Sequence, residues 1–466
     1  MKVRFMAVEK LNKEKVKDQW RNKYHLMPPV GFLNDPNGLC QVNDTYHISF
    51  QYSPAMDLKK GWGHYSTKDF VHYKQYEPLI VADSDYDKDG AYSGSAFVEN
   101  NEIHYFYTGN IKLAGDYDYI YHGRVSNVIH CTSKDGIHLS KKELLLSNED
   151  YPSDMTCHVR DPKIIKINDR YYMCLGARDK NSVGCVLIYE SDDLMNWHYL
   201  SRITSKEPFG YMWECPDIFE LDGRLVLMTC PQGIDYQENK YENIYENGYF
   251  LLDDIRKNQV VSNFHSLDRG SDFYAQQTFQ DQNGRRILIG WMGLPETKYS
   301  DPCLENGWIH SLTLPRVLTL IENHIYQYPI AELRQLRNNH ISIHLDKNET
   351  YDYKTNCVEL HVKPHKQSFC IQLREDTVLS YENHIFSLTI NQSGYGRTCK
   401  HIEIDHMDEI TIFSDHSTLE IFINHGEYTM SSLIYDRKEH TNIEVTCSCD
   451  IDIYELNSFE IEEVSE

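Results

Sequence analysis

A polar turn followed by an aromatic or aliphatic run recurs five times in the first two-thirds of the chain. The copies begin at residues 43, 100, 168, 222 and 283. Polar turn residues before such runs predict β-hairpins. The repeat of about 54 to 68 residues suits the four-stranded blades of a β-propeller, and five copies imply five blades. An ordinary antiparallel domain is the alternative, but the near-even spacing favours the propeller.

The pattern changes after residue 345 to strict alternation of apolar and polar residues, which predicts a β-sandwich. The expected strands cover 357–362, 369–373, 409–413, 419–423 and 442–446. The sequence therefore predicts an all-β protein, with a five-bladed β-propeller followed by a C-terminal β-sandwich. The boundaries that we expect are an N-terminal helical segment at 1–23, the propeller at 24–330, a linker or short helix at 331–345 and the sandwich at 346–466.

Both ends of the chain carry local predictions. Leu11, Val16 and Trp20 fall roughly on one face of an amphipathic helix predicted over residues 8–23. The acidic run at 460–466 predicts a solvated end.

Composition narrows the function. The formal net charge of −24 over 466 residues argues against nucleic acid and against anionic membrane surfaces. The start has no apolar signal region, and no apolar run reaches the length of a transmembrane helix. The 13 cysteines are scattered singly, which is typical of reduced thiols in the cytoplasm. No His/Cys group has zinc spacing, so we expect no metal.

A polar residue precedes each turn at a similar distance. Asp35, Ser93, Asp161 and Glu214 stand seven or eight residues before their turns, and Asp272 stands eleven before the fifth. Equivalent positions of propeller blades converge on the axis, so these groups are expected to meet in one axial pocket. Converging carboxylates are costly unless function requires them. This pattern predicts an active site.

The first of these residues lies in the run Asn34-Asp35-Pro36-Asn37-Gly38, whose composition predicts a tight turn. Glycoside hydrolysis needs one protonated and one ionised carboxyl group. Asp35, short and rigidly held, suits the nucleophile. Glu214 follows Trp213 in an apolar run that disfavours the charged form, so it suits the general acid and then the general base. Asp161 follows Arg160 and suits binding of substrate hydroxyls or stabilisation of positive charge.

Nearby aromatic residues fit either sugar binding or core packing: Phe32, Trp62, Tyr92, Trp213 and Trp291.

Further short segments carry a family resemblance. They are Phe50-Gln51-Tyr52-Ser53-Pro54, Trp62-Gly63-His64, Tyr92-Ser93-Gly94-Ser95, Arg160-Asp161-Pro162, Glu214-Cys215-Pro216-Asp217, Asp272-Phe273-Tyr274-Ala275, Leu314-Pro315-Arg316 and the sandwich segment 415–424. With the run at 34–38, they span nearly the whole chain. The chain resembles glycoside hydrolase family 32, the β-fructofuranosidases. Phe32-Leu33, Ser53 and Gln276 depart from residues frequent in the family and leave the three acids untouched.

The resemblance implies retaining hydrolysis of a terminal β-D-fructofuranosyl bond without cofactor or metal. Asp35 is then the nucleophile, Glu214 the acid/base and Asp161 the transition-state stabiliser. The residues expected at the substrate are Phe32, Leu33, Asn34, Gln51, Trp62, Tyr92, Ser93, Arg160, Cys215 and Trp291.

The expected substrate is sucrose 6-phosphate and/or sucrose, in intracellular sucrose catabolism. A phosphorylated substrate needs a local basic patch in this acidic chain, and Lys59, Lys60, His64 and Arg178 are the candidates by position. Hydrolysis of fructans, fructosyl transfer and a non-catalytic carbohydrate-binding propeller are the alternatives. The expected partner is a small sugar, with no nucleic acid and no membrane, and a homo-oligomer remains open.

Overall fold

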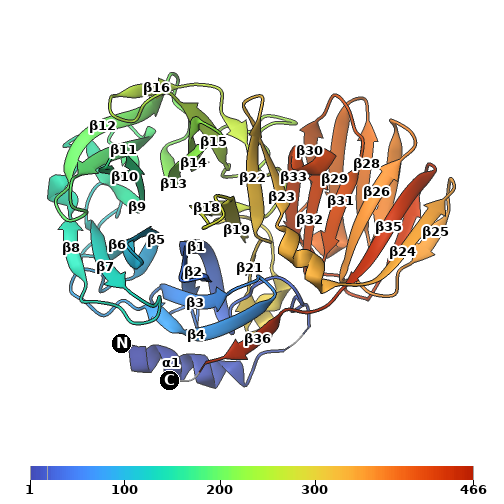
Figure 1. Ribbon diagram of the computed structural model, residues 1–466, viewed down its shortest axis with the longest axis horizontal. Helices are drawn as coiled ribbons and strands as arrows, with labels where there is room; N and C mark the ends of the chain where they lie inside the picture. The colour runs from blue at the N-terminus through green and yellow to red at the C-terminus, as the bar shows by residue number, and fades with distance from the viewer. Residues whose placement is uncertain (1, 18, 465–466) are drawn as a thin grey trace.

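The first part of the chain forms a ring of sheets around a common axis, and the second part forms two stacked sheets beside it (Figure 1). The computed structural model describes residues 2–17 and 19–464. In these residues the ring contains five sheets and the stack contains two. The chain is therefore mostly β, as predicted, with a propeller followed by a sandwich.

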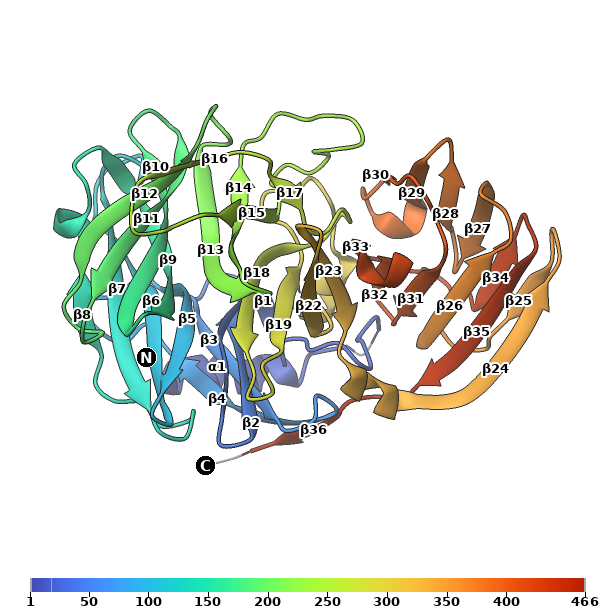
Figure 2. The ribbon, with the colours of Figure 1, turned by 45° about the horizontal axis from the view of Figure 1, so that its top comes forward.

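Each sheet of the ring places its first strand nearest the axis (Figures 1 and 2). These inner strands contact one another in a closed circle. They are β1 (Gly31–Val42), β5 (Ala91–Glu99), β9 (Met155–Ile167), β13 (Met212–Leu221) and β18 (Tyr274–Gln280). Their antiparallel hairpin partners are β2 (Thr45–Ser53), β6 (Glu102–Lys112), β10 (Arg170–Asp179), β14 (Arg224–Gln232) and β19 (Arg286–Met292).

The recurring polar turns join these hairpins. In the first copy Asn43 and Asp44 have φ of 47° and 60°, and in the third Asn168 and Asp169 have φ of 50° and 61°. Two successive positive φ values match the right-handed twist of the flanking strands, and Asn and Asp tolerate them better than most residues. This explains why the same residue types recur at each turn.

The outer strands complete the ring. They are β3 (Gly61–Thr67), β4 (His72–Ile80), β7 (Arg124–Ser133), β8 (Glu143–Leu146), β11 (Gly184–Ser191), β12 (His198–Ser205), β15 (Gly248–Leu252), β16 (Gln259–Val261), β17 (His265–Ser266), β20 (Trp308–Ile309), β21 (Ser311–Leu312), β22 (Arg316–Ile321) and β23 (His324–Pro329), with the 3-10 helices η1 (Asn148–Asp150) and η2 (Pro302–Asn306).

Four inner strands carry a pairing irregularity near the same end. The register shifts between Leu33 and Pro36 in β1, between Ala91 and Gly94 in β5, between Glu214 and Asp217 in β13, and between Tyr274 and Gln277 in β18. The hairpin of β9 and β10 shifts too, between Cys174 and Gly176. A bulge bends a strand and redirects its side chains, and it tolerates proline.

The predicted tight turn at 34–38 is wrong, because these residues lie inside β1 at its bulges. Gly38 has φ of 56°, and a Cβ there would lie 2.8 Å from the Trp62 ring. The Pro and Gly of this run therefore serve a bulged strand that is packed closely against its neighbours.

The sandwich consists of one sheet with the order β24-β35-β26-β31-β32-β33 and one with the order β25-β34-β27-β28-β29-β30. The five predicted strand regions are strands β26 (Val358–Pro364), β27 (Phe369–Leu373), β31 (Ile410–Ser414), β32 (Thr418–Ile423) and β34 (Asn442–Val445). The others are β24 (Arg337–Leu345), β25 (Thr350–Asp352), β28 (Thr377–Glu382), β29 (Ile385–Ile390), β30 (Cys399–Glu403), β33 (Tyr428–Leu433) and β35 (Cys449–Leu456), with η4 (Gln392–Gly394) and η5 (Asn424–Gly426). Residues 331–345, expected as a linker or short helix, contain the short 3-10 helix η3 (Ala331–Leu336) and the strand β24.

The N-terminal helix differs from its predicted position. The helix α1 is Lys2–Lys13, whereas we expected 8–23, of which residue 18 lies outside the described part of the chain. Trp20 has φ of 66°, which no helix allows, and its ring meets Tyr435 of the sandwich edge-on. Leu11 is exposed. The sequence pattern predicted that Trp20 lies on one face of a helix. Trp20 instead lies outside the helix and packs against the sandwich. None of the described helices is long and apolar enough to cross a bilayer.

The acidic tail is more ordered than the prediction of a solvated end. Residues Glu460–Glu463 form β36, which pairs in parallel with β4 of the first sheet (Figure 1). Their side chains remain exposed, while the backbone completes a sheet edge. The last two residues of the predicted tail lie outside the described residues.

Candidate active site

The bulges bring side chains of three inner strands together around Cys215. The backbone N–H of Cys215 donates to Oδ2 of Asp161 at 2.9 Å. The Cys215 sulfur lies 3.9 Å from Oδ2 of Asp35. Glu214 precedes Cys215 on β13. The carboxyl groups of the first, third and fourth repeats therefore lie in one place, although their residues are up to 179 positions apart along the chain.

Asp35 is held by three polar side chains from β1, β2 and β5. Asn34 Nδ2 donates to its Oδ1 at 2.8 Å, Gln51 Nε2 lies 3.4 Å from its Oδ2, and the Ser93 hydroxyl donates to Oδ2. Burial raises the pKa of Asp35; hydrogen bonds from Ser93 and Asn34 oppose this, and the charge of Glu214 adds to it. The result is a fixed carboxylate whose charge is destabilised by its surroundings.

Glu214 accepts hydrogen bonds from three different strands. Arg160 Nη2 binds its Oε1 at 2.5 Å, while Gln232 Nε2 and the Tyr274 hydroxyl each bind its Oε2 at 2.7 Å. Trp213 turns away from the site and stacks on Phe250. The expected apolar setting of Glu214 is therefore wrong, because alternate strand residues point to opposite faces and the chain brings in polar groups from elsewhere.

Asp161 occupies the bulge of β9 with φ of 64°, a value that redirects its side chain at a cost in backbone energy. Its N–H donates to Thr108 Oγ1 at 2.8 Å, and its Oδ2 lies 3.9 Å from Arg160 Nε. Burial raises the pKa of Asp161 to about 7; Arg160 opposes the shift and Glu214 adds to it. This carboxyl group therefore exchanges its proton near neutral pH.

Of the ten residues expected at the substrate, Asn34, Gln51, Ser93, Arg160 and Cys215 join this network. Phe32 and Trp291 lie at its edge and meet with ring centroids 6.2 Å apart. The Trp62 indole is fully buried and donates to the carbonyl of Tyr92 at 3.0 Å, which ties β3 to β5. Leu33 is fully buried in the core between sheets.

Asp272 does not join the other repeat acids, which corrects the expectation of five convergent positions. It stands before β18 rather than within it, and Arg397 of the sandwich binds it. The fifth sheet contributes Tyr274 to the site instead. The larger spacing of Asp272 from its turn, eleven residues rather than seven or eight, is the signal of this difference.

The four candidates for a basic patch have different surroundings. Lys59 pairs with Asp89 at 3.2 Å, and His64 is buried against His47 and Tyr76. Lys60 reaches the site, where its Nζ donates to Asn34 Oδ1 at 3.1 Å and lies over the Phe32 ring. Burial lowers the pKa of Lys60 to about 7, and Asp35 opposes the shift. The Arg178 guanidinium lies over the ring of Tyr211, the residue that immediately precedes β13.

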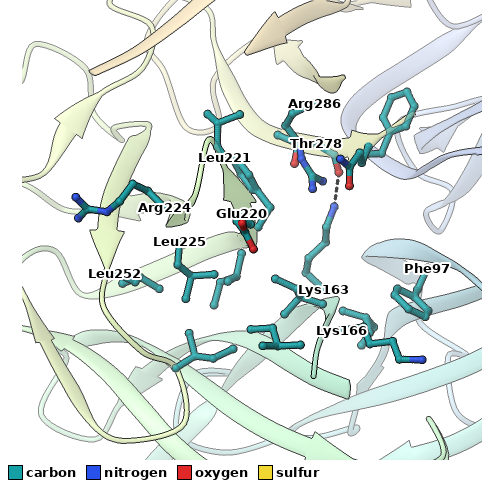
Figure 3. Close-up of a pocket in the computed structure, with 18 of the residues that line it drawn as sticks. Phe97, Lys163, Lys166, Glu220, Leu221, Arg224, Leu225, Leu252, Thr278 and Arg286 are labelled. Carbon is teal, nitrogen blue, oxygen red and sulfur yellow. Dashed lines mark hydrogen bonds between the residues drawn. The ribbon is translucent and has the colours of Figure 1, made fainter. Parts of the chain in front are cut away.

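A cavity of about 1240 Å³ opens at the opposite end of the inner strands, where the hairpin turns of Asn168 and Gly223 line it (Figure 3). Lys163 lies between this cavity and the acids, and its Nζ is 3.2 Å from Asp217 and donates to the carbonyl of Thr278. None of the three acids lines this cavity among the described residues. The candidate chemistry therefore belongs to the end that holds Asp35 and Glu214.

Sequence reasoning did not identify Gln232 and Tyr274 as partners of Glu214. Tyr274 lies in one of the segments that carried the family resemblance, so it could have been considered. Gln232 stands on β14 opposite Met212, and a hairpin register would have been needed to place it near Glu214.

Comparisons with known proteins agree with this architecture. The profile of the Glycosyl hydrolases family 32 N-terminal domain matches residues 25–329, and that of the Glycosyl hydrolases family 32 C terminal matches residues 330–462. The chain is 36% identical over 447 residues to the sucrose-6-phosphate hydrolase of Bacillus subtilis (strain 168), covering 92% of this chain and 91% of the relative. It is 35% identical over 467 residues to that of Staphylococcus xylosus, covering 94% and 92%.

Solved structures are also similar. The sucrose-6-phosphate hydrolase from Lactobacillus gasseri superposes with a TM-score of 0.87 at 28% identity, covering 97% of both chains. A GH32 beta-fructofuranosidase from Bombyx mori superposes with a TM-score of 0.85 at 27% identity, covering 99% of both chains.

Proposed function

We propose that this chain, which belongs to glycosyl hydrolase family 32, is a retaining β-fructofuranosidase that hydrolyses sucrose 6-phosphate and sucrose. The observation that carries the proposal is the meeting of Asp35, Asp161 and Glu214 around Cys215. Several relatives that are 34–36% identical over most of the chain carry the name sucrose-6-phosphate hydrolase, which supports the substrate.

In the first step, the protonated carboxyl of Glu214 gives its proton to the glycosidic oxygen. The Asp35 carboxylate forms a bond to C2 of the fructosyl ring as the bond from C2 to that oxygen breaks. In the second step, Glu214 takes a proton from water, the water oxygen bonds to C2, and the Asp35 ester bond breaks. Two displacements at C2 retain its configuration.

The surroundings of each acid suit these roles. Asp35 needs a fixed attack line, and hydrogen bonds from Asn34 and Ser93 restrict its carboxylate. Arg160, Gln232 and Tyr274 stabilise the carboxylate that Glu214 becomes after it has given up its proton. Asp161, with its pKa of about 7, becomes ionised more readily when positive charge develops on the fructosyl ring.

Each of the five sheets in the ring is one blade of the proposed five-bladed propeller, and the three acids lie on inner strands of the first, third and fourth blades. The proposed location is the cytoplasm, because all thirteen cysteines are free thiols and reducing conditions suit them.

Variants of the two reacting acids test the proposal. Asp35→Asn and Glu214→Gln should each lower kcat on sucrose 6-phosphate and on sucrose by at least about 10²–10⁴-fold, the range of general acid–base assistance. In Glu214→Ala, azide should take the place of water in the second step, because this nucleophile attacks the ester without base assistance. Fructosyl azide of β configuration would support retention. Near-full hydrolysis by both variants would overturn the assignment, and a wild-type chain that binds but cleaves neither sugar would support the carbohydrate-binding alternative.

A further inference from the structure

Three arginines gather beside Glu214, and only one of them has an acidic partner. Arg160 binds Glu214, whereas Arg124 and Arg178 form no salt bridge among the described residues. Ala177 of β10 faces Val159 of β9, so the flanking Arg178, His158 and Arg160 lie on the other face of this hairpin.

Arg124 reaches the same face from the neighbouring sheet. It begins β7, two residues before Ser126, whose hydroxyl donates to the carbonyl of Cys157 at 2.8 Å. Burial lowers the pKa of Arg124, and the charge of Arg160 adds to this. The start of β7 therefore lies directly against the start of β9, which carries His158 and Arg160.

Each of the three guanidinium groups keeps a buried nitrogen without a hydrogen-bond partner. These atoms are Arg124 Nε, Arg160 Nη1 and Arg178 Nε, counted over residues 2–17 and 19–464. Buried charged donors without partners are costly, since the lost hydration is not replaced. All three arginines lie close enough to His158 to act on its charge, and their free donors suit an anion that supplies the missing acceptors.

His158 adds no charge to this group. Burial lowers the pKa of His158 to about 2, and Arg160, Arg124 and Arg178 all contribute to the shift. Its Nε2 lies 3.2 Å from the carbonyl oxygen of Tyr119, so the neutral ring donates there. The cluster therefore carries three positive charges beside the two carboxyl groups of Glu214 and Asp161, in a chain whose formal net charge is −24.

The cluster lies on the side of the leaving group. Arg178 lies 4.7 Å from the ring centroid of Tyr211, three residues before Glu214, and its Nη2 donates to Ser182 Oγ at 3.0 Å. The hydroxyl of Tyr121, in the loop between β6 and β7, lies 3.2 Å from Ser182 Oγ. In the proposed function Glu214 protonates the departing oxygen, so the departing sugar lies next to these residues.

We propose that Arg124 and Arg178 bind the phosphoryl group of a phosphorylated leaving sugar, the glucose 6-phosphate part of sucrose 6-phosphate. A guanidinium group presents paired N–H donors that match phosphate oxygens, and two such groups balance a phosphate dianion. The inference rests on the proposed function for its geometry and adds to it the residues that recognise phosphate. Of the four basic candidates from the sequence, it selects Arg178, and it adds Arg124.

The test compares Arg124→Gln, Arg178→Gln and the control Arg170→Gln, whose arginine pairs with Glu190 and Asp192 on the surface. Calorimetric titration measures binding of glucose 6-phosphate and of glucose, and kcat/KM is measured for sucrose 6-phosphate and sucrose. Each cluster variant should weaken binding of glucose 6-phosphate and lower kcat/KM for sucrose 6-phosphate by about 10- to 100-fold. For sucrose, kcat/KM of each cluster variant should stay within about threefold of the wild-type value. The control Arg170→Gln should match the wild type in all of these measurements.

Two results would overturn the inference: equal affinity of the wild type for glucose 6-phosphate and glucose, or equal losses for both substrates in the cluster variants. Unchanged sucrose turnover also serves as the check that each variant is folded. The same binding and kinetic constants are measured for Arg178→Lys, which keeps the positive charge. If the wild type hydrolyses neither substrate, the proposed function fails. The binding titration then still decides the phosphate site on its own.

Discussion

Arg397 of the sandwich donates two hydrogen bonds to Asp272 of the propeller, from Nε to Oδ2 at 2.6 Å and from Nη2 to Oδ1 at 2.8 Å. Both side chains are 1% exposed. The N–H of Leu433, at the end of β33, donates to the same Asp272 carboxylate at 2.9 Å. The acid that the sequence pattern grouped with the catalytic candidates therefore joins the two domains.

Asp272→Asn should destabilise the protein by about 1.5–3 kcal/mol, because the buried Arg397 guanidinium loses one of its two carboxylate partners and keeps only Asp301, at 2.7 Å. Urea unfolding followed by tryptophan fluorescence measures the loss. Asp192→Asn, at an exposed acid, should change stability by less than about 1 kcal/mol. Activity per folded molecule should not change, since Asp272 does not contact the three acids. A loss of activity without a loss of stability would contradict the assigned role.

A second contact between the domains predicts a pH dependence of stability. His25 lies between two carboxylates of the sandwich, with Nδ1 3.0 Å from Asp415 and Nε2 3.0 Å from Glu420. Burial alone would lower the pKa of His25, but these hydrogen bonds and charges raise it to about 9. The imidazolium is therefore favoured in the folded state.

Because the pKa in the folded state exceeds the unfolded value of about 6.5, this stabilisation is complete below pH 6.5 and is lost as the pH rises to 9. The shift corresponds to about 3 kcal/mol. The urea midpoint should fall across this window, and His25→Gln should be less stable at pH 6 and nearly independent of pH above it. His122→Gln, at an exposed histidine, should follow the wild type. A flat wild-type profile from pH 6.5 to 9 would contradict a charged His25.

The sequence was sufficient to predict the sheets and the meeting of Asp35, Asp161 and Glu214. Hairpin turns have a strong local signature, and equal spacing from a turn fixes a position in the ring. The sequence was insufficient to predict the surroundings of Glu214. Tyr274 and Gln232 come from other strands, and they make this environment polar although the residues next to Glu214 in the sequence are apolar. His158 could have been found, since it alternates with Arg160 on one strand, but Arg124 reaches the cluster only through the packing of β7 on β9.

Tyr274→Phe should lower kcat/KM by about tenfold while leaving the fold intact. The variant loses the 2.7 Å hydrogen bond from its hydroxyl to Glu214, and hydrogen bonds to charged groups contribute about 1.5–3 kcal/mol. The ring itself remains packed near Trp291. Tyr249→Phe is a matched control, since this hydroxyl accepts from the N–H of Ile325, far from the acids. Equal rates in Tyr274→Phe and the wild type would mean that this bond has no part in turnover.

Ser93→Ala should move the acid limb of the pH profile of kcat/KM to higher pH. The proposed nucleophile must be ionised, and burial already raises the pKa of Asp35, whereas the hydrogen bond from Ser93 lowers it. Without this donor, the pKa of Asp35 rises further. A larger fraction of Asp35 is then protonated at a given acidic pH, and the acid limb of the profile reports this ionisation. Ser95→Ala on the same strand is the control, because its buried hydroxyl donates to the carbonyl of Pro162 and not to Asp35. A limb that moves equally in both variants, or to lower pH in Ser93→Ala, would show that another group controls it.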